Sequence, residues 1–195
     1  MIQARSGQRR SLDYSKIIFS DQKELLTEKR MNKYGFREKE DRPVEAIKVG
    51  EQALAFGLKD QQGNNVELES FQGKKVLLSF HPLAWTGVCA EQMKSLEANR
   101  EELAKLNTVA LGLSVDSVPS KKAWGESLGI EQTSLLSDFW PQGELAAKYG
   151  IFRDKHGTSE RANIIVDEDG RVVFVKIYPI SELPDMEEIL DFLRK

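Results

Sequence analysis

The 195-residue chain is predicted to fold as an α/β domain in which helices flank a central mixed β-sheet. From Val44 onward, short strand signals alternate with helix signals, which is typical of a sheet with parallel crossovers. The largely apolar run Val76–Phe80 is typical of a strand buried on both faces. Near the C-terminus, two strand signals flank the turn Asp167–Gly170 and predict an antiparallel hairpin, so the sheet is expected to contain both directions.

The remaining strand signals lie between clear turn or helix signals. A short strand is expected at Val66–Leu68, because it follows the turn sequence Gly63–Asn65. Further strands are predicted at Val109–Val115, Leu135–Leu136, Ile164–Val166 and Val172–Tyr178.

Four helices are expected in this part of the chain. A long amphipathic helix follows Cys89, with a core-facing stripe formed by Met93, Leu96, Leu103 and Leu106. Ser120 is expected to cap a helix at Lys121–Leu128, and Gly150 to end a helix at Gly143–Tyr149. Pro184 is expected to open the last helix, whose apolar positions are Leu183, Met186, Ile189, Leu190 and Leu193.

Charge divides the chain into two parts. Residues 1–44 carry 11 Lys or Arg against 7 Asp or Glu, whereas residues 45–195 carry 17 against 24. We therefore expect an N-terminal extension at 1–44, partly disordered or with a short helix at Asp21–Arg30, and one domain at 45–195. Met31 is a possible native start. The net charge of −3 argues against a nucleic-acid-binding protein.

The sequence favours a cytoplasmic location. The longest early apolar run, Ile17–Phe19, is too short for a secretory signal, and no run approaches the length needed to span a membrane. Arg9–Arg10 and the acid-free first dozen residues leave twin-arginine export and a transit peptide open as alternatives. The only cysteine excludes an intramolecular disulfide, so no oxidising compartment is implied.

Cys89 is the leading candidate for a functional residue. It follows an apolar strand and a loop containing Pro82 and Gly87, and it opens the long helix. A thiol at a helix N-terminus lies at the positive end of the helix dipole, beside backbone N–H groups that lack partners. Both features favour the thiolate, which is the nucleophilic form.

Pro82, Thr86 and Cys89 form the pattern Pro-x-x-x-Thr-x-x-Cys, which resembles the active-site signature of the peroxiredoxin family. The segment Val49–Asp60 is similar to the opening strand of that family, and Ser137–Gly143 is similar to a segment of the one-cysteine, alkyl hydroperoxide reductase E type. Arg161 occupies the position of the family's active-site arginine. The resemblance covers Val44–Lys195 and implies a thioredoxin-like fold, a layout that the predicted elements also match.

The resemblance implies a role for each of these residues. The Cys89 thiolate would attack a peroxide oxygen, and Arg161 would supply a permanent positive charge to stabilise the thiolate and the leaving oxygen. Thr86 would align the peroxide, and Pro82 would stiffen the loop and shield the sulfur. The backbone N–H groups of Val88 and Cys89 would complete the polar cradle, while Trp85 would contribute to an apolar collar on the substrate side.

Each residue also has an ordinary structural interpretation. A lone cysteine is often a small buried hydrophobe, Thr86 is a plausible helix N-cap, and Arg161 beside a strand is commonly a surface ion-pair partner. Trp85 and Trp140 are also typical of core or rim aromatics. Only the complete motif set favours the functional interpretation.

The remaining polar residues restrict the kinds of reaction and metal site that the sequence allows. Gln92, a candidate substrate-binding residue, stands where many relatives have a Glu that positions the arginine; it can still accept a hydrogen bond but brings no negative charge. His81 is expected near Cys89, with a catalytic role left open, whereas His156 is far away in the sequence. No His, Cys and Asp spacing suggests a metal site, and the lack of Cys-x-x-Cys excludes a reductase that acts through its own dithiol.

The function expected from the resemblance is thiol-dependent reduction of hydrogen peroxide and organic hydroperoxides through a sulfenic acid on Cys89. No metal, haem, flavin or other cofactor is expected. The partners would be an external thiol reductant, such as a thioredoxin, a glutaredoxin-like protein or a low-molecular-weight thiol, and a second copy in a homodimer. Two alternatives remain: a peroxide-sensing redox switch, and a thioredoxin-fold binding module with little turnover.

Overall fold

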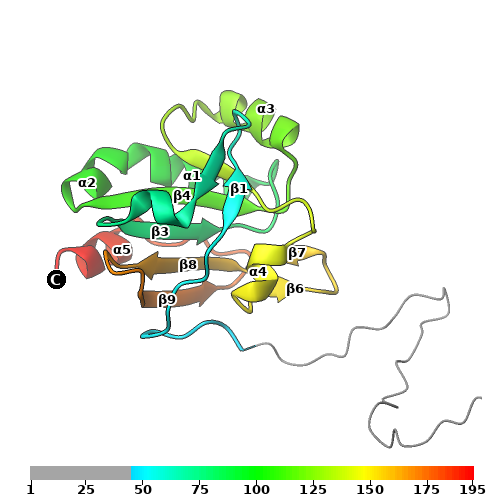
Figure 1. Cartoon of the computed structure of the whole chain (residues 1–195). Coiled ribbons are helices and arrows are strands. Elements are labelled where there is room, and N and C mark those ends of the chain that lie inside the picture. The colour runs from blue at the N-terminus through cyan, green and yellow to red at the C-terminus, as the bar shows by residue number, and fades with distance from the viewer. Residues whose placement is uncertain (1–44) are drawn as a thin grey trace, which may run out of the picture. The chain divides into compact units, whose positions relative to one another are not determined.

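The computed structural model describes residues 45–195, which form a seven-stranded mixed sheet with helices on both faces (Figure 1). The strand order is β2-β1-β5-β4-β3-β8-β9, with β6 and β7 in a separate two-stranded ribbon. The strands are β1 (Gly57–Lys59), β2 (Asn65–Glu67), β3 (Lys75–Phe80), β4 (Thr108–Ser114), β5 (Ser134–Ser137), β6 (Phe152–Arg153), β7 (Thr158–Ser159), β8 (Arg161–Val166) and β9 (Val172–Tyr178). The helices are η2 (Leu68–Phe71), α1 (Gly87–Ala98), α2 (Arg100–Lys105), α3 (Val118–Leu128), α4 (Glu144–Lys148) and α5 (Met186–Leu193).

The directions of the central strands confirm the predicted mixed sheet. β3, β4 and β5 are mutually parallel, because α1 and α2 connect β3 to β4 and α3 connects β4 to β5. β8 and β9 form the expected antiparallel hairpin, and β8 adds antiparallel to β3. Among residues 45–195, no helix is both long enough and apolar enough to cross a membrane.

Side-chain alternation along β3 and β8 builds a core on each face of the sheet. Val76, Leu78 and Phe80 pack in the cluster that includes α4, while Leu77 packs in the cluster formed with α1, α2, α3 and α5. On β8, Ile165 faces this second cluster. The alternation therefore places Ser79, Arg161 and Asn163 on the α1 side of the sheet.

Several local expectations need correction. The segment Val49–Asp60 forms a strand only at Gly57–Lys59, with a single bridge between Gln52 and Arg171 nearer its start. Asn99 divides the helix after Cys89 into α1 and α2, because its backbone leaves helical geometry with φ −99° and ψ 6°. Its side-chain amide donates to the carbonyl of Ser95.

The cap of α3 was wrongly predicted. The N-cap position is Ser117, not Ser120, because Pro119 fits the first turn and the helix begins at Val118. The ribbon of β6 and β7 was not predicted, since each strand has only two residues. The expected helix at Asp21–Arg30, the extension at 1–44 and Met31 lie outside the described residues.

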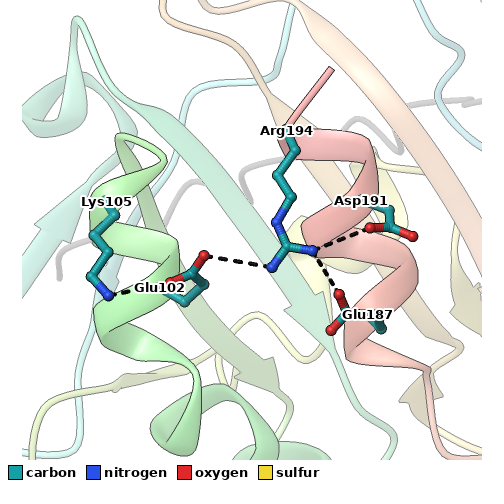
Figure 2. Close-up of polar contacts among 5 residues, drawn as sticks. All are labelled: Glu102, Lys105, Glu187, Asp191 and Arg194. Atoms are coloured by element: carbon teal, nitrogen blue, oxygen red, sulfur yellow. Dashed lines mark hydrogen bonds and ion pairs between the residues drawn. The ribbon is translucent and has the colours of Figure 1, made fainter.

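Two side-chain clusters fix α1 and α5 in the fold. The carboxylate of Glu97 on α1 accepts hydrogen bonds from the backbone N–H groups of Glu131, Gln132 and Thr133 and from the Thr133 hydroxyl, over 2.6–3.1 Å. Figure 2 shows the second cluster, in which Arg194, the C-cap residue of α5, contacts Glu187, Asp191 and Glu102, the last of these on α2.

We predict that Glu97→Gln destabilises the fold by about 1–2 kcal/mol, because an amide offers one acceptor oxygen to these donors instead of two charged ones. Burial raises the pKa of Glu97, but the Thr133 hydroxyl and the three N–H groups outweigh burial and lower it overall. The carboxylate therefore contributes its full stability above the ordinary glutamate pKa of about 4.3, and loses it as the pH falls through the lowered value.

Chemical unfolding of both proteins at several pH values would check this. The difference between them should be largest near neutral pH and shrink in acid. A difference that is constant over the whole range would show that the charge of Glu97 is not involved.

Candidate active site

The loop between β3 and α1 positions the cysteine. Pro82 is buried two residues after the end of β3, Thr86 is the N-cap residue of α1, and Cys89 is the third residue of that helix. The Thr86 hydroxyl donates to the Leu83 carbonyl oxygen at 2.9 Å and makes no capping bond to the helix. The N–H groups of Val88 and Cys89 lie in the first turn, where a helix offers them no carbonyl partner.

The β4–α3 connection holds this loop in place. The carboxylate of Asp116 accepts from the Ala84 backbone N–H at 2.8 Å and from the Ser114 hydroxyl at 2.7 Å. Trp85 adopts a positive φ of 64°, and its indole N–H donates to the Ser120 hydroxyl at 3.1 Å. Because a left-handed Trp is strained, the loop conformation depends on these anchors.

Arg161 brings a buried cation to the sulfur. It is only 2% exposed, and one guanidinium nitrogen lies 3.5 Å from Sγ of Cys89, which is itself 1% exposed. The guanidinium also donates to the Ile180 carbonyl oxygen at 2.8 and 3.2 Å and to the side-chain oxygen of Gln92. Within the described part of the chain, no carboxylate lies within ion-pair distance of Arg161, so all of its hydrogen-bond partners besides the sulfur are neutral oxygens.

Gln92 is held in one orientation. Its amide nitrogen donates to the Ser79 hydroxyl at 2.8 Å and to the Phe80 carbonyl oxygen at 3.2 Å. A backbone carbonyl can only accept, so the amide nitrogen must face Phe80 and the oxygen must face Arg161. Gln92 therefore contacts the arginine without bringing a negative charge.

Lys121 is a second basic residue near Cys89. Lys121 on α3 is fully buried, and neither its ammonium nor the two ring nitrogens of His81 have a hydrogen-bond partner among residues 45–195. The His81 ring lies 5.2 Å from that of Trp124. Burial lowers the pKa of Lys121 to about 7. The carboxylates of Asp116 and Asp138 and the sulfur of Cys89 raise this pKa, but burial outweighs them. Burial, Lys121 and Arg161 together lower the pKa of His81 well below its usual value, which favours a neutral ring.

The candidate residues divide into a central and a peripheral set. Cys89, Arg161 and Gln92 are in direct contact, and Pro82, Thr86 and Val88 come from the loop and first helical turn that carry Cys89. Trp85 is 58% exposed and Trp140 is 84% exposed, so both are surface aromatics rather than core residues. His156 lies in the turn between β6 and β7. Among residues 45–195, no group of metal-ligating side chains could hold an ion.

Lys121, Asp116 and Ser79 were missed from the sequence. Lys121 lies three residues before Trp124 and seven before Leu128, so helical spacing places it on the buried face of α3. That spacing was the available signal. Nothing local identified Asp116 or Ser79, whose partners come from distant segments.

Comparisons with known proteins identify the family. The model of the AhpC/TSA family matches residues 49–175. Alkyl hydroperoxide reductase E of Mycobacterium tuberculosis is 35% identical over 148 residues, covering 75% of this chain and 96% of that protein. The mitochondrial thioredoxin-dependent peroxide reductase of Drosophila melanogaster is 31% identical over 161 residues, covering 78% and 67%.

Solved structures agree with the sequence matches. The reduced 2-Cys peroxiredoxin of Plasmodium vivax has a TM-score of 0.69 and 28% identity, covering 76% of this chain and 81% of that one. AhpC of Enterococcus faecalis has a TM-score of 0.70 at 24% identity, covering 75% and 90%. The chain belongs to the AhpC/TSA family, and the predicted thioredoxin-like fold is confirmed.

We predict that Lys121→Met stabilises the protein by about 1–4 kcal/mol at pH 6, because it removes a buried ammonium that has no hydrogen-bond partner in residues 45–195. The pKa of Lys121 is about 7 in the folded protein and ordinary in the unfolded chain. Between these values the unfolded chain binds more protons, so the stability of the original protein rises with pH.

The gain from Lys121→Met should therefore be full below pH 7 and disappear as the pH approaches about 10, the ordinary value for lysine. Thermal unfolding of both proteins across this range checks the sign. A variant that is less stable than the original at pH 6 would show that the ammonium is compensated in the folded state.

Proposed function

We propose that this member of the AhpC/TSA family is a thiol-dependent peroxidase that reduces hydrogen peroxide and organic hydroperoxides through Cys89. One observation carries the proposal: a guanidinium nitrogen of buried Arg161 lies 3.5 Å from the sulfur. Cys89 also lies in the first turn of α1, where the helix dipole favours negative charge. Positive charge from two sources therefore lies at the sulfur, where it would stabilise the negative charge of an attacking thiolate.

In the first step, the thiolate attacks the nearer oxygen of the peroxide. The S–O bond forms as the O–O bond breaks, and the leaving oxygen departs as hydroxide or alkoxide and takes up a proton to give water or an alcohol. Sulfur is oxidised to a sulfenic acid while the peroxide is reduced. Arg161 is placed to stabilise the negative charge that moves from sulfur to oxygen.

The loop residues would orient the substrate. The Thr86 hydroxyl already donates its proton to the Leu83 carbonyl, so its oxygen remains available to accept from the O–H of a hydroperoxide. The N–H groups of Val88 and Cys89 would donate to the peroxide oxygens, and buried Pro82 would exclude water from the sulfur. Leu83 and Trp85, 42% and 58% exposed on this loop, would form an apolar rim for the organic part of a hydroperoxide.

An external thiol would complete the cycle. Because the chain has a single cysteine, no second thiol of the same chain can attack the sulfenic acid. One external thiol would form a mixed disulfide with Cys89 and release water, and a second would restore the Cys89 thiol and leave as a disulfide.

A homodimer and a cytoplasmic location also belong to the proposal. The family membership supports the homodimer, and the single cysteine is consistent with the cytoplasm.

We predict that Cys89→Ser abolishes peroxide consumption, because serine cannot form a nucleophilic anion of comparable reactivity here. Stopped-flow tryptophan fluorescence would follow the reduced protein mixed with hydrogen peroxide or a bulky organic hydroperoxide. Mass spectrometry should then find one added oxygen atom on Cys89 of the original protein. A steady rate of consumption with a thiol reductant distinguishes a peroxidase from a peroxide sensor, and a first step no faster than that of a free thiol would refute both.

We predict that Arg161→Ala slows the first step about 100- to 1,000-fold, the usual cost of removing one electrostatic donor from an active site. Arg161→Lys should recover only part of the rate, because an ammonium cannot reach the sulfur, Gln92 and Ile180 in the same planar geometry. Rates would be compared at several pH values, with unfolding curves to confirm that each variant is folded. An unchanged rate in folded Arg161→Ala would remove this residue from the site.

A further inference from the structure

A continuous chain of polar contacts leads from Arg161 to the C-terminal helix. It lies on the α1 side of the sheet, and its middle members, Ser79, Asn163 and Tyr178, are buried. Ser79 and Asn163 are direct partners in the pairing of β3 with β8, and Arg161 pairs with Tyr178 in that of β8 with β9. The links run from Arg161 to Gln92, then Ser79 (2.8 Å), Asn163 (2.8 Å), Tyr178 (3.5 Å) and the carboxylate of Glu188 on α5 (3.3 Å).

Every hydrogen bond in this chain points the same way. Gln92 donates to Ser79, Ser79 donates to Asn163, Asn163 donates to Tyr178, and Tyr178 donates to Glu188. One end, the guanidinium of Arg161, has only donors, and the other end, the carboxylate of Glu188, has only acceptors. The chain thus aligns its dipoles between a buried cation and an anion at the surface.

The Glu188 carboxylate is the acceptor at the outer end of this series of hydrogen bonds. The Phe80 carbonyl fixes the amide of Gln92, and in the observed order each following group donates outward until Tyr178 donates to Glu188. Glu188 supplies that acceptor while both of its oxygens also contact the ammonium of Lys176 at 2.7 Å. Without the acceptor, the Tyr178 hydroxyl proton has no partner in this chain, and the Asn163 amide is free to turn.

We propose that Glu188 is a positioning residue for the reaction at Cys89, acting through Tyr178, Asn163, Ser79 and Gln92 to hold Arg161 in the orientation that faces the sulfur. The proposal rests on the peroxidase function proposed above. It assigns to α5, remote in sequence from the active-site loop, a direct part in ordering the site. The same polar chain gives a surface carboxylate a route by which it acts on a buried arginine.

Charged groups near Cys89 and near Glu188 also act on the sulfur through space. A test must separate their effect from that of the hydrogen-bond chain. Arg161 contacts the sulfur of Cys89, and Lys121, which Asp116 and Asp138 also influence, interacts with that sulfur electrostatically. Lys176 and Tyr178 contact Glu188, and Asp185 acts on Tyr178. Removing any nearby anion acts through space and makes the thiolate easier to form. Loss of the ordered arginine acts in the opposite direction, so the sign of the change distinguishes the two effects.

The test compares Glu188→Ala with Glu187→Ala in the full chain. Glu187 is the matched control, because it has the same charge on the same helix and contacts Arg194 rather than Tyr178 (Figure 2). Thiolate formation is followed by ultraviolet absorbance against pH, with Cys89→Ser as the baseline. We expect Glu188→Ala to shift thiolate formation to higher pH, and Glu187→Ala to leave it unchanged or shift it slightly lower.

Tyr178→Phe breaks the same chain without removing a charge, so it should shift thiolate formation in the same direction as Glu188→Ala. In both variants the first peroxide step should slow about three- to tenfold, the range that corresponds to one ordinary hydrogen bond. The double variant should be no slower than the more affected single variant, because both changes interrupt one path.

A shift to lower pH in Glu188→Ala, or a response equal to that of Glu187→Ala, would overturn the proposal. Additive effects in the double variant would overturn it as well. The absorbance readout needs no peroxide. A protein that fails to reduce peroxides but shows the predicted shifts would refute the proposed function and leave the role of Glu188 supported.

Discussion

The site depends on a buried guanidinium whose hydrogen-bond partners within residues 45–195, apart from the sulfur, are neutral oxygens. Arg161 is enclosed between β8, α1 and the segment that follows β9, and it contacts oxygens of Gln92 and Ile180. A buried cation without a carboxylate partner is costly, and the thiolate of Cys89 is the anion best placed to compensate it. The arrangement that stabilises Arg161 in the fold is therefore the same one that would activate the cysteine.

The fold brings this pair together by ordinary strand and helix geometry. Alternation along β8 points Arg161 and Asn163 toward α1, and the loop after β3 delivers Cys89 to the first turn of that helix. Asp116 and Ser120, from the connection after β4 and from α3, hold the loop at Ala84 and Trp85. Neighbouring crossovers of the parallel strands thus meet at one end of the sheet, where the site lies.

Much of this was predictable from sequence because it is carried by local patterns. The apolar run of β3, the turn between β8 and β9, and the spacing of Pro82, Thr86 and Cys89 each lie within one segment. For Lys121, only burial was predictable, because its spacing to Trp124 places it on the buried face of the helix. The polar chain through Ser79, Asn163, Tyr178 and Glu188 was not predictable, since its contacts depend on the register of three strands and on where α5 packs. The break at Asn99 was not predicted, and Ser120 was wrongly expected to be the cap because Pro119 places the helix start at Val118.

The most direct measurement of the central claim is the pH of thiolate formation in Gln92→Glu, beside the original protein. A carboxylate at this position would compete with Cys89 for the charge of Arg161. If neutral pairing leaves that charge to the sulfur, thiolate formation will move to higher pH in the variant. Thiolate formation at the same or a lower pH in folded Gln92→Glu would contradict the claim that the neutral partners of Arg161 are what favour the thiolate.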